Sequence, residues 1–159
     1  DLHYPLRRQR QMCIRDSYTS HWATTPRAYI QETCLQCHKD KTEAQMNKVL
    51  DSMNAHYNGK LREAEASMGQ MFIAFRQAND AGVDPAVIKQ AQDLHSVAHT
   101  NWEWWTASNG SWFHNMPQAK ESLAKSVAAS QKATKLLRDA VAAKVAAQAQ
   151  PQAQQTAQK

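Results

Sequence analysis

The sequence has few of the residues that interrupt helices, with four glycines and five prolines among its 159 residues. Runs of β-branched residues, which favour strands, are also absent. Alanine, glutamine, lysine and methionine are frequent instead, and all four have good helix propensity. This composition predicts an all-α protein of one modest domain.

Long hydrophobic runs are missing too, since no stretch reaches the roughly 18 to 20 apolar residues of a membrane span. Charge of one sign is not concentrated either. The formal net charge is +5, and the basic residues are scattered along the chain. Proteins that bind nucleic acids usually gather basic residues in a patch or stripe. We therefore expect neither a membrane span nor a nucleic-acid partner.

Cysteine is scarce, with three residues in all, and one of them lies in an unusual segment. Residues 1–17 share no periodicity with the rest and resemble translated sequencing-adapter read-through. We predict that they are non-native, with a disordered basic arm as the alternative. Without Cys13 only two cysteines remain, so a disulfide framework is not expected. The sequence does not begin with Met, and we expect it to be a fragment.

One long helix is predicted from about Lys41 to Asn79, after an irregular stretch over residues 18–39. At about 1.5 Å per residue it would be roughly 58 Å long, so it needs a partner along its length. Its apolar residues recur at steps of three and four, which is typical of a helical stripe: Met46, Leu50, Met53, Tyr57, Leu61, Ala64, Met68, Met71 and Phe75.

Two further helices are predicted beyond a break at residues 81–85. Gly82 suits the end of the long helix, whereas Asp84 and Pro85 suit the start of the next, which should run to about Ser108. The linker 111–117 leads to a third helix that begins near Pro117. Residues 142–159 are rich in Ala and Gln, and we predict a disordered tail there.

The sequence Cys-Leu-Gln-Cys-His at residues 34–38 is the most informative motif. C-x-x-C-H is the attachment signature of c-type haem: two thiols add to the two vinyl groups, and the adjacent His becomes an axial ligand. A zinc site would need two more Cys or His ligands, and a redox dithiol would normally follow a strand. Haem is favoured, while zinc, a dithiol and a chance match remain open.

A low-spin c-type haem also needs a second axial ligand, most often His or Met. His114 lies in a short linker among aromatic residues, and His21 lies beside Trp22 just before a Thr-Pro pair. Both are candidate ligands. The remaining histidines of the predicted helices are interpreted as structural: His56, His95 and His99.

The order of "SHWATTP", "CLQCH", a long helix and "WEWWTASNGSWFHNMPQA" resembles the C-terminal third of ammonia-forming, pentahaem cytochrome c nitrite reductase. His21 stands 13 residues before Cys34, as the family pattern has it. The last segment departs from that pattern with Trp112 in place of a small residue and with Met116 inserted before Pro117. The resemblance covers residues 18 to about 140.

The resemblance implies a role for each motif residue. Cys34 and Cys37 would bind the last haem covalently, with His38 as its proximal ligand. His21 would be the distal ligand of the second haem, and His114 that of the fourth. Residues 18–141 would then form the C-terminal haem-binding helical region of a multihaem cytochrome.

The resemblance also implies what the whole protein does. The family reduces nitrite to ammonium with six electrons at a Lys-ligated haem, and this chain contains no C-x-x-C-K motif. The catalytic pocket and a calcium site would lie upstream, so the fragment alone would be inactive and would relay electrons. A quinol-linked cytochrome would be the electron donor, the long helix would form a homodimer, and the protein would be periplasmic.

Other classes of protein remain open. An octahaem nitrite- or hydroxylamine-processing cytochrome could share this C-terminal part. A non-catalytic multihaem electron carrier would usually have denser C-x-x-C-H motifs, and a monohaem helical-bundle cytochrome usually carries its motif on the last helix. The number of haem motifs upstream distinguishes these classes.

Overall fold

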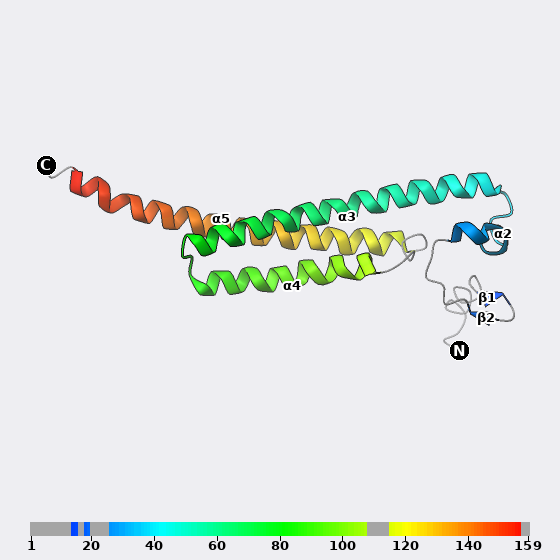
Figure 1. Ribbon diagram of the computed structural model, residues 1–159, viewed down its shortest axis with the longest axis horizontal. Coiled ribbons are helices and arrows are strands. Elements are labelled where there is room, and N and C mark those ends of the chain that lie inside the picture. Colours follow the sequence, from blue (N-terminus) through cyan, green and yellow to red (C-terminus); the bar gives the residue numbers. More distant parts are fainter. Residues whose placement is uncertain (1–13, 16–17, 20–25, 108–114, 157–159) are drawn as a thin grey trace.

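The computed structural model describes residues 14–15, 18–19, 26–107 and 115–156, and it is almost entirely helical, which confirms the all-α prediction. Its helical elements form a short helical segment followed by three long helices (Figure 1). In chain order they are η1 Pro26–Tyr29, α2 Ile30–Thr33, α3 Glu43–Asp80, α4 Pro85–Ala107 and α5 Met116–Thr156.

Two very short strands precede the helices. β1 Ile14–Arg15 pairs antiparallel with β2 Tyr18–Thr19. The sequence did not predict them, since two-residue strands carry no alternation of apolar and polar residues. The irregular stretch predicted over residues 18–39 is also partly wrong, because η1 and α2 lie within it.

α3 spans 38 residues, within two residues of its predicted ends. Its first turn is closed by a capping box, in which the Thr42 hydroxyl accepts from Gln45 N and the Gln45 side chain accepts from Thr42 N. Such reciprocal bonds satisfy backbone donors that have no partner inside a helix. At about 1.5 Å per residue the helix is about 57 Å long.

The turn after α3 follows its predicted local signals. Gly82 has φ +65°, the left-handed conformation that glycine adopts at little cost, and Val83 N donates to Ala78 O at 3.0 Å. Asp84 accepts a hydrogen bond from Ala86 N at 2.7 Å and so caps α4. α4 therefore begins at Pro85 as predicted and ends one residue early, at Ala107.

α5 begins at Met116 and runs through residues 142–156, where the composition predicted a disordered tail. Packing on the other helices nevertheless ends near Val141, and the side chains of residues 142–149 are all exposed. Alanine, glutamine and lysine favour a helix without tertiary contacts. The packed part of α5 thus ends near Val141, and the helix continues beyond it.

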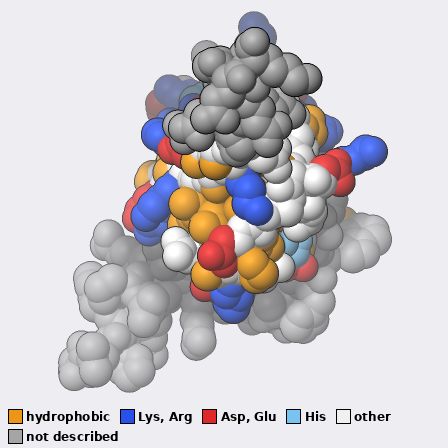
Figure 2. Space-filling view, turned by 90° about the vertical axis from the view of Figure 1, so that its left-hand side faces the viewer, with side chains coloured by type: hydrophobic (Ala, Val, Ile, Leu, Met, Phe, Trp, Pro, Cys, Tyr) orange, Lys and Arg blue, Asp and Glu red, His pale blue; other side chains and the backbone are white. Residues whose placement is uncertain are grey.

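The three long helices lie side by side, with α5 between α3 and α4 (Figure 1). α3 and α5 run in the same direction. α4, which lies between them in the sequence, runs in the opposite direction (Figure 1). Fully buried alanines line the contacts, which lets the helix backbones approach closely: Ala64, Ala74, Ala78, Ala91, Ala98, Ala119 and Ala133. Seen from the α3–α4 turn, hydrophobic side chains fill the middle of the end face and charged ones surround them (Figure 2).

The predicted apolar stripe of α3 is covered within the chain. Its first part, Met46 and Leu50, packs on Ile30 of α2, and the rest packs on α4 and α5. α4 and α5 thus supply the partner that was expected along the length of this helix. A dimer seam on α3 therefore has to use a different face.

Within the described residues, no helix is both long and apolar enough to cross a membrane.

Tyr57 ties α3 to the end of α4, because its buried hydroxyl donates a hydrogen bond to the Trp105 carbonyl. Burial raises the pKa of Tyr57 above its ordinary 10.0. The neutral phenol is thus favoured in the folded state, so its stabilisation is complete below about pH 10 and is lost as pH rises through the folded-state pKa.

We expect Tyr57→Phe to lower the free energy of unfolding by about 1–2 kcal/mol, since the Trp105 carbonyl would lose its donor. The difference between the two proteins should shrink between about pH 9 and about pH 12, because the phenolate cannot donate. Urea unfolding followed by circular dichroism at several pH values measures this difference. A constant difference across that range would contradict the burial argument.

Candidate functional site

The C-x-x-C-H motif forms one helical turn that continues α2. Cys34 N donates to Ile30 O at 2.9 Å, which extends the helix into the motif. The Cys34 carbonyl then accepts from both Cys37 N, at 3.2 Å, and His38 N, at 2.9 Å. One carbonyl therefore holds the second cysteine and the histidine in a fixed relation to the first cysteine.

The three motif side chains differ in exposure. Cys34 is half-buried and packs beside the small core of Ile30, Met46 and Leu50. Cys37 and His38 are exposed, and both cysteines are free thiols. The turn is thus anchored on one side and presents a thiol and an imidazole on the other.

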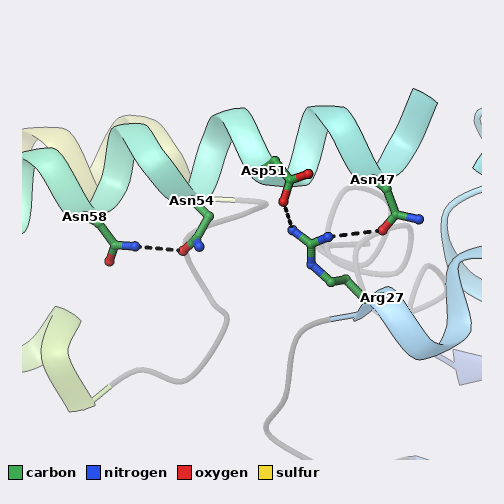
Figure 3. Close-up of polar contacts among 5 residues, drawn as sticks. All are labelled: Arg27, Asn47, Asp51, Asn54 and Asn58. Carbon is green, nitrogen blue, oxygen red and sulfur yellow. Dashed lines mark hydrogen bonds and ion pairs between the residues drawn. The ribbon is translucent and has the colours of Figure 1, made fainter. Parts of the chain in front are cut away.

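Polar contacts hold this segment against the start of α3. The Arg27 guanidinium donates to Asn47 Oδ1 at 3.3 Å and forms an ion pair with Asp51 (Figure 3). Closer to the start of α3, Gln31 Nε2 donates to Glu43 Oε2 at 3.0 Å. The turn formed by residues 34–38, called the attachment turn below, is therefore held against the first turns of α3.

A carboxylate follows the motif histidine. The pKa of Asp40 lies below its ordinary value, chiefly because Lys41 Nζ donates a hydrogen bond to it at 2.6 Å. The nearby His38 contributes a smaller lowering, and desolvation opposes both. Asp40 is thus ionised at neutral pH and places a negative charge near His38.

The donor set fits haem attachment better than its alternatives. Among the described residues, no three His, Cys, Asp or Glu side chains gather closely enough to hold one metal ion. Zinc binding needs such convergence, whereas haem attachment needs two thiols at the porphyrin edge and an imidazole at the iron. A helical segment precedes the motif, whereas a thioredoxin-type dithiol would follow a strand.

A comparison with protein families decides the relationship. The model of the family described as cytochrome c552 matches residues 1–159. The chain belongs to the cytochrome c552 family. The family resemblance predicted from the order of the motifs is confirmed.

Curated relatives carry related names. The cytochrome c nitrite reductase subunit NrfA of Nitratidesulfovibrio vulgaris is 33% identical over 130 residues, which cover 77% of this chain and 24% of the relative. Cytochrome c-552 of Parabacteroides distasonis is 26% identical over 114 residues, and that of Bacteroides fragilis is 28% identical over 116. Each of these two alignments covers 72% of this chain and 22% of the relative. The chain thus spans about a quarter of the length of these relatives.

Five site residues were predicted from the sequence. His21 and His114 lie outside the described residues, so their roles stay predictions. The structure brings the other three, Cys34, Cys37 and His38, together on one turn.

The histidines interpreted as structural lie on the long helices of this cytochrome c552 family member. His56 is exposed on α3. His95 and His99 lie one turn apart on α4, with ring centroids 5.6 Å apart, in a row that begins at Phe72 of α3 and ends at Trp102. None of the three adjoins the motif in sequence, and their interpretation as structural stands unchanged.

Sequence reasoning missed the residues that hold the attachment turn on α3. Arg27 bonds to residues 20 and 24 positions later in the chain. Nothing in the local pattern around Arg27 indicates these partners, because an isolated arginine is usually a solvated surface residue.

Proposed function

We propose that this chain attaches one haem c through Cys34 and Cys37, with His38 as an axial ligand. The observation that carries the proposal is the single turn on which Cys34 O accepts from both Cys37 N and His38 N. The two thiols would form thioether bonds, and the adjacent imidazole would bind the iron. When bound, the haem supplies a one-electron redox centre.

The chain's own residues would hold this site in place. Cys34 packs against the core and would hold its thioether bond at a fixed position, whereas Cys37 is exposed and would be open to the second bond. The ionised carboxylate of Asp40 lies near His38 and is paired with Lys41.

We further propose that the chain is the C-terminal part of a periplasmic cytochrome c nitrite reductase that reduces nitrite to ammonium with six electrons. The name of the Nitratidesulfovibrio relative and the order of the motifs support this assignment. Cys34, Cys37 and His38 would serve an electron-relay haem, while His21 and His114 would be distal ligands of two others.

The catalytic Lys-ligated haem, a calcium site and the contact with a quinol-linked donor cytochrome would lie outside this chain. The alternatives are an octahaem nitrite- or hydroxylamine-processing cytochrome and a non-catalytic electron-transfer cytochrome. The present chain contains one C-x-x-C-H motif and no C-x-x-C-K motif, so upstream sequence separates the three.

Sequencing the parent DNA upstream of Tyr18 tests the assignment. We expect one C-x-x-C-K motif and three more C-x-x-C-H motifs, which together with Cys34–His38 make five haems. Seven additional motifs would favour the octahaem alternative. An upstream region without any haem motif would contradict the nitrite reductase proposal.

A homodimer through α3 is part of the same proposal, but on the outer face of the helix. This face consists of exposed residues at steps of three and four, small ones for the most part and one arginine: Ser52, Ala55, Gly59, Arg62, Ala66, Gly69 and Ile73. A Cβ on either glycine would meet nothing within 4 Å. Each mid-helix glycine costs about 0.5–1 kcal/mol relative to alanine, a cost that close approach of a second helix would offset.

A further inference from the structure

The segment that carries the attachment turn is held to α3 by few contacts. The apolar part is the small cluster of Ile30, Met46 and Leu50. The bond from Gln31 to Glu43 acts close to the beginning of α3. Arg27 makes the contact that reaches furthest along α3, a full turn beyond Asn47 (Figure 3).

The contact made by Arg27 is geometrically selective. Asn47 and Asp51 lie one helical turn apart on the same face of α3, and a single guanidinium engages both (Figure 3). A planar guanidinium with fixed donor directions sets both the distance and the rotation of the group that it binds. One side chain therefore fixes the register of the preceding segment on α3.

The restraint is transmitted to the motif through continuous helical backbone. Arg27 belongs to η1, and the Thr33 hydroxyl donates to Tyr29 O at 2.6 Å. Ile30 O accepts from both Cys34 N, at 2.9 Å, and Leu35 N, at 3.0 Å. No flexible link separates η1 from the motif, so fixing Arg27 fixes where the turn lies.

The exposure of this ion pair indicates what it contributes. The side chains of Arg27 and Asp51 are 39% and 66% exposed. Ion pairs this open to water add little to the stability of a whole fold. The contact should therefore affect the position of the attachment turn more than the stability of the whole fold.

We propose that Arg27 is a positioning residue for haem attachment, which holds the C-x-x-C-H turn in register with α3 through Asn47 and Asp51. This inference rests on the proposed haem function. A turn held in register presents both thiols and the imidazole in one arrangement before haem arrives.

The test compares Arg27→Ala with Lys48→Ala in the full chain, expressed with a periplasmic c-type haem maturation system. Lys48 is an exposed cation between Asn47 and Asp51, so its replacement removes the same charge from the same region. We expect Arg27→Ala to lower covalent haem per chain at least twofold and Lys48→Ala to leave it unchanged. Helix content, measured by circular dichroism, should be the same in both.

The midpoint potential gives a second readout that a merely structural role would not move. In the fraction of Arg27→Ala that carries haem, the potential should change, because the turn would no longer hold the His38 imidazole in one orientation toward the iron. Haem content and potential equal to those of the unmodified chain would overturn the positioning role alone. An unmodified chain without haem would overturn the haem proposal together with it.

A charge exchange keeps the test decisive if Arg27→Ala folds poorly. Arg27→Asp combined with Asp51→Arg restores an ion pair between η1 and α3. We expect this double variant to carry at least twice as much haem as Arg27→Asp alone. Equal haem content in the two variants would contradict the proposal.

Discussion

Replacing Cys34 and Cys37 together by serine is expected to abolish haem retention in the unfolded chain. A thioether bond survives denaturation, whereas a haem held only by axial ligands is released when the fold is lost. Serine matches cysteine in size, Cys34 is half-buried and Cys37 is exposed, so α3, α4 and α5 should still fold. Haem staining after denaturing electrophoresis measures retention.

Two further variants separate attachment from ligation. Cys13→Ser changes the one cysteine outside the motif and should leave haem retention unchanged. His38→Ala should keep the covalent bonds but remove an axial ligand, so the absorption spectrum of the attached haem should change. Haem retained by the double serine variant after denaturation would show that the cysteines do not attach it.

The second large effect concerns the outer face of α3. Gly59→Trp together with Gly69→Trp should raise the dissociation constant of the proposed homodimer by on the order of a hundredfold, because overpacking costs about 1–3 kcal/mol and both copies of the chain carry the change. A Cβ at either position would meet nothing within 4 Å in the single chain and both positions are exposed, so the monomer should fold normally.

Sedimentation velocity over a range of concentrations measures this dissociation. Ala143→Trp is the matched control, because it adds the same side chain at an exposed position of α5 beyond the packed part of that helix. The control should dimerise like the unmodified chain. Equal dimerisation of the double tryptophan variant would exclude the outer face of α3 as the seam.

The long helices could be predicted because their signals are local. Gly82, Asp84 and Pro85 each prefer a backbone conformation at a helix end, and the structure uses all three as expected. The apolar stripe of α3 also predicted its buried face. What the stripe could not predict was its partner, since an apolar face is satisfied equally by helices of the same chain and by a second copy.

Other parts of the fold depend on contacts that no periodicity reveals. η1 and α2 are four residues each, too short to show a helical repeat, and they depend on Ile30 packing against α3. The last part of α5 shows the opposite case. Its Ala- and Gln-rich sequence lacks an apolar face and was predicted as disordered, but its helix propensity is high.

The candidate site also has a part that could be predicted from the sequence and a part that could not. The C-x-x-C-H spacing is a local signal, and it predicted Cys34, Cys37 and His38. The support from Arg27 could not be predicted, because its partners lie one and two turns into a helix that begins 16 residues later. Sequence spacing therefore identifies the groups that would bond to haem, and the structure adds the group that holds them in place.

The proposed function requires a covalent haem on the turn from Cys34 to His38. Intact mass spectrometry of the denatured, purified chain from a periplasmic c-type maturation host, followed by mass analysis of its proteolytic peptides, tests it most directly. The account predicts one haem per chain, located on the peptide that contains Cys34 and Cys37. A denatured chain with the unmodified mass, or a haem located on another peptide, would contradict it.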